Sequence, residues 1–295
     1  MTLRQVKTVA FIGVGNMGAP MARRVKQAEF ELIVCDRNRA VLDEFVRLGV
    51  RTTTDAVDCV DADAVIVLLA NDAQIMNTML GDKGLIRAIP PGKHPIICMM
   101  STTLPDTLAA LKSPLEAAGA SLIDAPISGG IVGAERGTLT IMLGGEASDI
   151  EAVTPLMNSM GQHIFHCGDL GSAEVVKVVN NMLCLANMFL TAEAIDLAEK
   201  YGVSFEKLSP ILAVSSGLNF LTADATTGRA QYRAWARSPD AYTAIHNVAS
   251  KDLHMARKLA NLAQLDLGLL ERVSQYVDSD DPEAMKRWMR SGKVI

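Results

Sequence analysis

The chain has 295 residues, of which 49% are hydrophobic, and a formal net charge of −5. This length predicts two domains with a sizeable core, since a globular domain usually contains ~100–200 residues. The acidic balance and the lack of a long basic block argue against nucleic acid or an anionic membrane as a partner.

The five cysteines are scattered and odd in number, and none forms a C-x-x-C pair. We therefore expect reduced thiols, a cytoplasmic location and no metal site. The short segment before the first apolar run leaves no room for a targeting peptide, and no apolar run is expected to be long enough to span a bilayer.

A glycine-rich turn between a strand and a helix is the clearest local pattern. Residues 9–12 form a short apolar run, G-V-G-N-M-G follows at 13–18, and helical spacing continues to Val25. A second apolar run at 30–34 ends just before Asp36. A G-x-G-x-x-G in this context, with an acid about 20 residues further on, is the fingerprint of a dinucleotide-binding βαβ unit.

Each glycine of this turn has a predicted task. Gly13 permits the tight turn, Gly15 lets a pyrophosphate approach the backbone, and Gly18 lets the helix pack close to the strand. The N–H groups at the start of the helix would then meet the phosphate charge. A glycine-rich loop without a ligand is the alternative, and the strand, helix and acid in their expected places argue against it.

Asp36 is placed to accept the ribose hydroxyls of NAD. Its carboxylate would repel the 2′-phosphate of NADP, so the sequence favours NAD. Arg37 and Arg39 lie beside it, and either could hold that phosphate, which keeps NADP possible.

Strands and helices alternate up to residue 168, which predicts a doubly wound α/β sheet (a Rossmann domain) over residues 1–168. In such a sheet the ligand lies at the carboxyl ends of the strands. Asp72 is expected to cap the helix that follows it. We expect further helices at 40–48, 72–80, 105–118 and 150–160, and further strands at 64–69, 95–99, 121–123, 138–143 and 163–165.

The pattern changes after Gly171. One helical stretch from Ser172 to Lys200 contains neither Pro nor Gly and is apolar on nearly every side. Such a helix must be buried within a domain or between subunits. We therefore predict an all-α domain over residues 169–295, joined to the sheet through this helix, and a homodimer or homotetramer that buries it. The other expected helices are at 204–213, 251–264 and 269–277.

Lys177 lies within this apolar helix, and Asn180 and Asn181 follow at i+3 and i+4, on the same face. Burial and the positive charge of an oxidised nicotinamide both lower the pKa of a lysine from its usual value of about 10.4. Such a lysine can take a hydroxyl proton while hydride leaves the adjoining carbon. A lysine whose amine reaches the surface beside two asparagines is the alternative, and the spacing alone does not decide between them.

Four segments, in order and covering almost the whole chain, resemble the β-hydroxyacid dehydrogenase family, which includes 3-hydroxyisobutyrate dehydrogenase and tartronate semialdehyde reductase. The resemblance implies a Rossmann domain followed by a helical domain. It also implies hydride transfer between NAD(P) and the hydroxyl carbon of a short 3-hydroxy acid, or reduction of the matching semialdehyde. The segments are F-I-G-V-G-N-M-G-A-P-M-A at 11–22, D-A-P-I-S-G-G at 124–130 with G-T-L at 137–139, G-S-A-E-V-V-K-V-V-N-N at 171–181, and K-D-L at 251–253.

The resemblance implies a role for each matching residue. Lys177 would be the catalytic acid/base, with Asn180 and Asn181 orienting the reacting oxygen. Ser128, Gly129 and Gly130 would hold the substrate carboxylate, because successive N–H groups in a glycine turn bind anions. The implied cofactor contacts are Gly13, Gly15, Asn16, Met17, Gly18, Asp36, Arg37, Leu69, Ala70, Thr102 and Lys251.

The sequence also departs from the family pattern. Ala70 stands where a proline is common, and Ala244 and Asn247 stand where an aromatic residue and an acid are common, so the identity of the substrate stays open. His246 is expected to be structural. Two alternatives are an imine reductase, which shares this architecture but typically lacks the lysine, and a non-catalytic cofactor-binding module.

Overall fold

The structure is a computed structural model that describes residues 5–293. The chain divides into two compact units, here called the sheet unit, which ends at Lys177, and the helical unit, which begins at Val178. A Rossmann-type α/β unit followed by an all-α unit confirms the predicted fold class. The predicted domain boundary after residue 168 coincides with the end of the last strand, and it stays a prediction.

The sheet unit is built on one nine-stranded sheet with the order β3-β2-β1-β4-β5-β6-β8-β7, and β9 pairs with β8. Strands β1 to β6 are parallel to one another, so their carboxyl ends meet at one edge, whereas β8 runs antiparallel to β6. The strands are β1 (Thr8–Ile12), β2 (Glu31–Cys35), β3 (Arg51–Thr53), β4 (Ala64–Val67), β5 (Ile96–Met99), β6 (Ser121–Asp124), β7 (Ile127–Ser128), β8 (Leu139–Gly144) and β9 (Gly161–Gly168).

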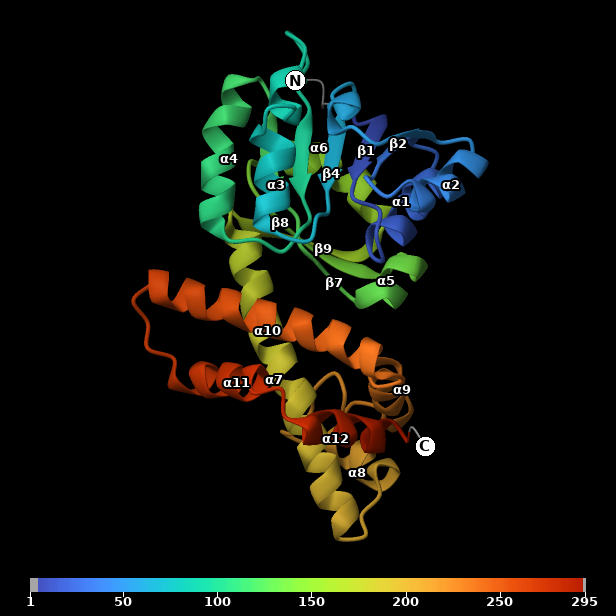
Figure 1. Cartoon of the computed structure of the whole chain (residues 1–295), viewed down its shortest axis with the longest axis vertical. Helices are drawn as coiled ribbons and strands as arrows, with labels where there is room; N and C mark the ends of the chain where they lie inside the picture. The colour runs from blue at the N-terminus through green and yellow to red at the C-terminus, as the bar shows by residue number, and fades with distance from the viewer. Residues whose placement is uncertain (1–4, 294–295) are drawn as a thin grey trace. The chain divides into compact units, whose positions relative to one another are not determined.

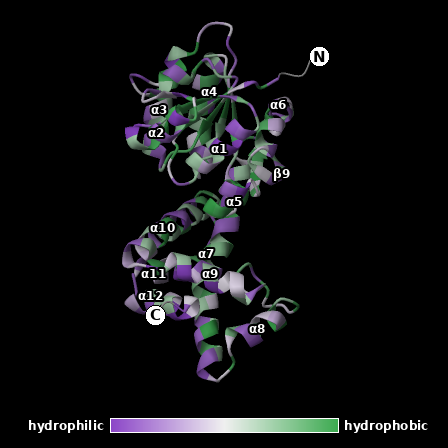
Figure 2. Cartoon of the chain, turned by 90° about the vertical axis from the view of Figure 1, so that its right-hand side faces the viewer, coloured by the Kyte–Doolittle hydropathy of each residue, from purple (hydrophilic) through white to green (hydrophobic). Residues whose placement is uncertain are grey.

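Alternate side chains of these strands point to opposite faces, and each face has its own helices. Phe11 and Ile66 pack with α1 (Gly18–Gln27), α2 (Arg39–Arg47), α5 (Gly130–Arg136) and α6 (Ala147–Asn158). Val65 and Val67 pack with α3 (Asp72–Leu80), α4 (Pro105–Ala117) and the short 3₁₀ helices η1 (Ala56–Cys59) and η2 (Leu85–Ala88). Figure 1 shows α3 and α4 on one side of the strands and α1 and α2 on the other, and the strands between them are largely green, the colour of hydrophobic residues, in Figure 2.

One expectation in the sheet unit was wrong, and helix α5 was not predicted. Asp72 does not cap α3: Asn71 is the N-cap residue, and its side chain accepts a hydrogen bond from the Gln74 amide at 3.0 Å. The glycine turn at Ser128–Gly130 is followed directly by helix α5, which the sequence analysis missed because its seven residues are too few for a readable period.

The helical unit consists of α7 (Ser172–Lys200), whose first residues belong to the sheet unit, and five further helices. They are α8 (Phe205–Leu212), α9 (Ala225–Trp235), α10 (Pro239–Leu262), α11 (Gly268–Asp278) and α12 (Pro282–Gly292). Their core is aromatic: Trp288 and Tyr232 are fully buried, and the Tyr232 hydroxyl donates to the Met188 carbonyl at 2.8 Å.

The predicted helices of this unit were incomplete. The helix expected at 251–264 is the second half of α10. Helix α10 begins at Pro239, and Ser238 is its N-cap residue. Serine followed by proline is a common helix start, so this beginning was readable from the sequence. Helices α9 and α12 were not predicted; α9 contains Gly228, where a Cβ would collide with the Leu221 carbonyl oxygen and press on the Phe205 ring.

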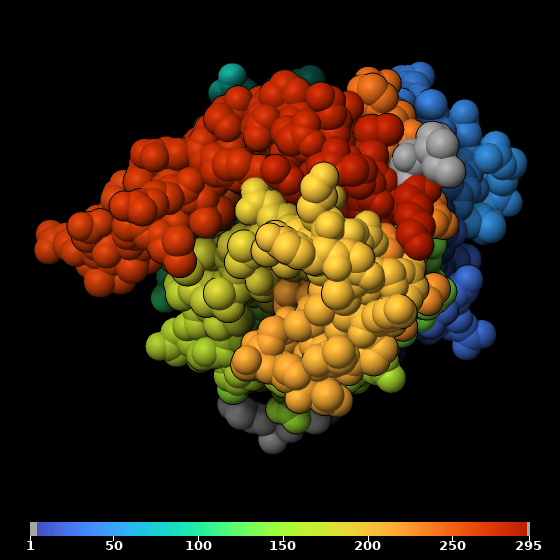
Figure 3. Space-filling model, turned by 90° about the horizontal axis from the view of Figure 1, so that it is seen from below, coloured from blue at the N-terminus to red at the C-terminus, as the bar shows by residue number. Residues whose placement is uncertain are grey.

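Helix α7 is only partly covered within the described chain, so burial within its own domain does not account for all of its apolar residues. Val176, Leu183, Leu190 and Leu197 are 42–63% exposed, so the helix is not covered on all sides within the described chain. In Figure 3 the yellow and gold atoms of its C-terminal half and of the following segment lie uncovered. The expectation that no apolar segment is long enough to span a bilayer was also wrong, since α7 is both long enough and apolar enough to do so. This is weak evidence, because core helices of other proteins meet the same criteria.

Candidate functional site

The glycine turn after β1 has the geometry that a dinucleotide requires. Gly13 has a φ of +95°, and a Cβ there would lie 2.2 Å from the Leu68 carbonyl oxygen. A Cβ on Gly18 would lie 2.2 Å from the Gly13 carbonyl oxygen, so only glycine allows α1 to start this close to the turn. Gly15 instead faces open space and is exposed, as the approach of a pyrophosphate demands.

Helix α1 begins behind Met17 without a side-chain cap and with no acid in its first turn. The Ala19 amide donates to the Gly15 carbonyl at 3.0 Å, and the positive end of the helix dipole at this start favours an anion. Asn16 is exposed and Met17 is half-buried in the same turn. The residues present thus fit the phosphates of a nicotinamide dinucleotide, which supplies the hydride acceptor when it is bound.

Asp36 follows the last residue of β2 and holds the turn by its carboxylate. Oδ2 accepts the Val14 amide at 2.9 Å, and Oδ1 accepts the Asn38 amide at 2.8 Å. Arg37 and Arg39 are exposed beside it. An anion at the end of β2 next to the glycine turn is the arrangement that binds the ribose of NAD.

Two further loops leave the same edge of the sheet. The Leu69 amide donates to Ser101 Oγ at 2.6 Å, and the Ala70 amide donates to Gln74 Oε1 at 3.1 Å. Ser101, which the sequence analysis did not single out, therefore ties the loop after β4 to the loop that contains Thr102. Since β1 and β4 are neighbours with loops to opposite sides of the sheet, this edge is the switch point at which α/β sheets bind ligands.

The turn at Ser128–Gly130 connects β7 to α5. Gly129 and Gly130 have φ values of +126° and +62°, which L side chains rarely adopt, and a Cβ on Gly130 would meet open space. Ser128 is half-buried at the end of β7, opposite Thr140 of β8. Exposed N–H groups in such a glycine turn are suited to an anion.

The start of α7 is fixed by a carboxylate from β6. Asp124, which is fully buried, accepts the Gly171 amide at 2.8 Å and the Glu174 amide at 2.9 Å. It thus serves the first turn of α7 as an N-cap side chain would. Burial raises the pKa of Asp124, and these amide hydrogen bonds oppose that rise.

Lys177 lies one turn further along α7 and is only 8% exposed. The structure therefore places this lysine in a buried position of the sheet unit, against the alternative of a side chain that reaches bulk water. Asp124 and Glu174 belong to two of the matching sequence segments, but no role was predicted for either residue, because a cap from a distant strand has no signature in local spacing.

In the helical unit, a chain of polar side chains joins α7 to α10. Asn180 Nδ2 donates to Asn181 Oδ1 at 3.1 Å, and Asn181 Nδ2 donates to Asp252 Oδ2 at 2.7 Å. Lys251 Nζ lies 3.0 Å from Asp252 Oδ1. Asp252 is 5% exposed and is connected to all three predicted residues of this unit, so it is a further candidate site residue, for which no role was predicted from the sequence.

His246 on α10 is almost fully buried, and its Nε2 lies 2.8 Å from the Val277 carbonyl oxygen. Its ring also stacks on Tyr242. These contacts give it a packing role within the helical unit, and Ala244 and Asn247 are exposed on the same helix.

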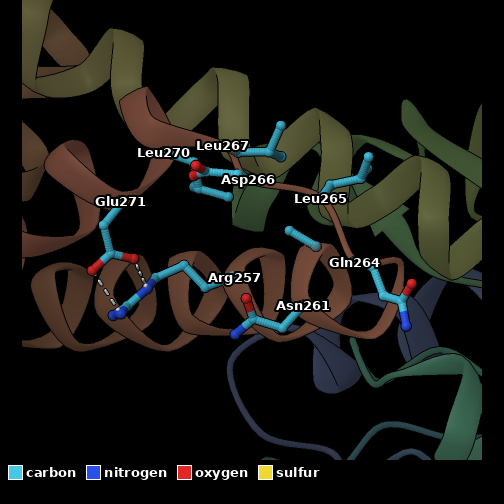
Figure 4. A pocket seen from close by; sticks show the side chains of 9 residues that line it. Arg257, Asn261, Gln264, Leu265, Asp266, Leu267, Leu270 and Glu271 are labelled. Carbon is cyan, nitrogen blue, oxygen red and sulfur yellow. Dashed lines mark hydrogen bonds and ion pairs between the residues drawn. The ribbon is translucent and has the colours of Figure 1, made fainter.

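A separate pocket of about 470 Å³ opens between the end of α10 and the start of α11 (Figure 4). Arg257 and Glu271 form an ion pair at 2.7 Å on its wall. None of the predicted site residues lines this pocket.

Two family models together match nearly the whole chain. Residues 8–168 match the NAD binding domain of 6-phosphogluconate dehydrogenase. Residues 171–288 match the NAD-binding domain of NADP-dependent 3-hydroxyisobutyrate dehydrogenase. The two matches meet at the start of α7.

Two relatives from Pseudomonas aeruginosa are similar over most of both chains. The NAD-dependent L-serine dehydrogenase is 35% identical over 278 residues, which is 94% of this chain and 88% of the relative. The 3-hydroxyisobutyrate dehydrogenase is 37% identical over 213 residues, which is 72% of this chain and 71% of the relative. The chain belongs to the β-hydroxyacid dehydrogenase family.

This β-hydroxyacid dehydrogenase is an NAD(P)-dependent enzyme, which confirms the resemblance and the predicted cofactor class. Among solved structures, the 3-hydroxyisobutyrate dehydrogenase of Mycobacterium tuberculosis has the same fold, with a TM-score of 0.81, 24% identity, and coverage of 97% of this chain and 99% of that chain. An imine reductase from Myxococcus stipitatus is more distant, with a TM-score of 0.64, 16% identity, and coverage of 96% and 99%. At that identity the likeness concerns the fold alone.

Proposed function

We propose that this dehydrogenase oxidises the hydroxyl group of a short 3-hydroxy acid, with NAD as the preferred hydride acceptor, and reduces the matching semialdehyde in the reverse direction. L-serine and 3-hydroxyisobutyrate, after which its two relatives are named, are both short carboxylic acids with a hydroxyl group on carbon 3. That shared chemistry defines the substrate class.

One observation carries the mechanism: Lys177 is buried on a helix whose start is anchored by Asp124. Asp124 begins the same segment that ends in the Ser128–Gly130 turn. A single carboxylate therefore joins the proposed carboxylate-binding turn to the helix that carries the proposed acid/base. Fixed geometry between a base and a substrate is worth many kcal/mol in rate, because it removes the entropy of bringing them together.

In the proposed reaction, the amine of Lys177 accepts the proton of the substrate hydroxyl group while hydride leaves the carbon that bears this hydroxyl group. In the reductive direction Lys177 returns the proton to the oxygen. Ser128, Gly129 and Gly130 hold the substrate carboxylate through one hydroxyl and backbone N–H groups. Asn180 and Asn181 orient the reacting oxygen, and the bond from Asn181 to Asp252 limits the rotation of that side chain.

The proposed cofactor contacts are the glycine turn for the pyrophosphate, Asp36 for the adenosine ribose, and the loops with Leu69, Ala70 and Thr102 for the nicotinamide ribose. Arg37 and Lys251 are exposed and complete the proposed contacts. The Asp36 carboxylate supports a preference for NAD over NADP.

A substrate panel tests this proposal. The purified enzyme is assayed for NADH absorbance with both enantiomers of 3-hydroxyisobutyrate and of serine, and the 2-hydroxy acid lactate serves as the control. We expect turnover of the 3-hydroxy acids, little with lactate, and lower kcat/KM with NADP. Activity with a ketone and an amine, but with none of the acids, would identify an imine reductase instead.

We also infer that the enzyme is a homo-oligomer, a dimer or a tetramer, that covers α7. Val176, Leu183, Leu190 and Leu197 are exposed and follow one another at intervals of seven residues. This heptad spacing places them in one seam, as in packed helix pairs.

Light scattering of two variants tests this inference. Leu190→Glu should produce a smaller species, whereas Leu269→Glu, at an exposed leucine of α11, should not. A monomeric wild type would contradict the inference.

The cytoplasm remains the proposed compartment. The odd number and scattered spacing of the five cysteines suit a reducing environment.

A further inference from the structure

A buried acid lies beside the proposed acid/base. Glu174 precedes Lys177 by three residues in α7 and is 0% exposed. Its Oε2 accepts the Thr103 amide at 3.2 Å, whereas its Oε1 is buried and has no hydrogen-bond partner among residues 5–293. A carboxylate in such a place is costly, because burial disfavours a charge that is not fully hydrogen-bonded.

Asp124 in the same cluster shows the contrast. Both of its oxygens accept backbone amides, from Gly171 and from Glu174 itself. The N–H groups at the start of a helix stabilise a negative charge there. Two adjacent carboxyl groups with unequal hydrogen bonding do not ionise alike, and the better satisfied group keeps the charge.

The surroundings of Glu174 shift its pKa in both directions. Burial raises the pKa of Glu174 well above its usual value, and the carboxylates of Asp124 on β6 and Asp72 on α3 raise it as well. The Thr103 amide and Lys177 lower that pKa, and burial outweighs them.

The charge state of Glu174 matters for Lys177. Residues three apart in a helix lie on one face, about 5–6 Å apart at their Cβ atoms. An ionised Glu174 at that separation would favour the ammonium form of Lys177 and weaken it as a proton acceptor. An uncharged carboxyl group adds no negative charge beside the lysine.

Glu174 also connects α7 to the cofactor side of the sheet unit. Its partner Thr103 follows Thr102 in the loop after β5, and the Thr103 hydroxyl donates to Asp72 at 2.7 Å. The acid therefore joins the turn before Lys177 to a loop at the carboxyl edge of the sheet.

We propose that Glu174 is a positioning residue for the reaction: as an uncharged carboxylic acid it fixes the helical turn of Lys177 to the loop with Thr102 and Thr103, and adds no negative charge beside the lysine. This inference rests on the proposed role of Lys177. Its test includes a measurement that needs no turnover, so that failure of either idea can be recognised separately.

The first measurement is infrared spectroscopy of the whole protein at neutral pH in deuterated buffer. We expect the carbonyl stretch of a protonated carboxylic acid in the wild type and its loss in Glu174→Gln. Glu151→Gln, at an exposed glutamate of α6, is the matched control and should keep the band. A wild-type spectrum without a band that depends on Glu174 would overturn the proposal, whatever the activity of Lys177 variants.

The second measurement is the pH dependence of kcat/KM for oxidation. Gln resembles the uncharged acid, so Glu174→Gln should shift the acidic midpoint by less than about 0.3 pH unit. Removal of an ionised carboxylate would instead move that midpoint down by about 1 unit or more, and such a shift would overturn the proposal.

The third measurement separates position from charge. Glu174→Ala loses the contact with Thr103, and we expect kcat to fall about tenfold and Glu174→Gln to restore most of it. Thermal unfolding checks that both variants are folded. If Glu174→Ala does not fold, the infrared band and the pH profile of Glu174→Gln decide the matter. Wild-type kcat in a folded Glu174→Ala would remove the positioning role.

Discussion

The two units of this dehydrogenase hold their charged side chains in different ways. In the sheet unit, the carboxyl groups of Asp36, Asp124 and Glu174 accept hydrogen bonds from backbone amides. In the helical unit, charged groups pair with other side chains, as Arg229 does with Glu199 and Glu206.

The difference follows from the backbone. Strand ends and helix starts leave N–H groups without partners, and an acid nearby can accept them. The interiors of helices leave no such groups, so polar side chains there must bind one another. Asp36, Asp124 and Glu174 are therefore held by backbone amides of loops and of a helix start, whereas Glu199 and Glu206 depend on which helices pack together.

The largest expected effect concerns Lys177, the last residue of the sheet unit. Lys177→Ala should lower kcat about 10³-fold, because general acid–base catalysis contributes on the order of 10²–10⁴. Binding of NADH, followed by its fluorescence, should stay normal. Lys200→Ala, at the exposed end of the same helix, is the control. Turnover close to that of the wild type would remove Lys177 as the acid/base.

Asp252 tests the side-chain network of the helical unit. Asp252→Ala removes the acceptor of Asn181 and the partner of Lys251, and we expect kcat/KM to fall about 10- to 100-fold as the reacting oxygen loses its orientation. Asp278→Ala, which removes the acid that pairs with His254 at the surface, is the matched control. Equal steady-state constants for the two variants would show that the network is structural only.

Asp36 tests the backbone-held acids of the sheet unit. Asp36→Ala should lower the ratio of kcat/KM for NAD to kcat/KM for NADP about tenfold, because the Asp36 carboxylate no longer repels the 2′-phosphate of NADP. Asp36→Asn keeps an acceptor for the Val14 amide and separates the loss of charge from a loosened turn. If both variants keep the wild-type ratio, Asp36 does not contact the ribose.

The smallest expected effect is on stability, and it has opposite signs in the two units. Burial raises the pKa of Glu174 in the folded protein. Its contribution to the free energy of unfolding is therefore fully present below the unfolded-state pKa of about 4.3 and is lost as the pH rises through the folded-state pKa. Hydrogen bonds from Arg229 and Lys293 lower the pKa of Glu206, so its contribution is present above about 4.3 and is lost as pH falls.

Urea unfolding at a series of pH values on both sides of about 4.3 measures both contributions to the free energy of unfolding. The free energy of unfolding of the wild type minus that of Glu174→Gln should decrease with pH, and the difference from Glu206→Gln should increase. Slopes of the same sign would contradict the contrast between the units.

Much of the sheet unit could be predicted from the sequence, because its signals are local. The glycine turn, the acid after β2 and the alternation of strands and helices each depend on a few neighbouring residues. Boundaries shifted by up to about three residues, and α5 was too short to recognise. The helical unit was less readable, since α9 and α12 have mixed composition; they contribute Tyr232 and Trp288, respectively, to a shared core that forms only when the helices pack.

The sequence by itself determined the fold class, the family, the dinucleotide-binding turn and the lysine to which we assign the chemistry, because each is recorded in residue types at short spacing. Only the tertiary structure decided that Asp124 caps α7, that Glu174 is sealed against Thr103, that Asp252 holds Asn181, and that one side of α7 stays exposed. These contacts join residues about 50 to 70 positions apart along the chain, and no local pattern encodes a contact that forms only when distant strands and helices pack.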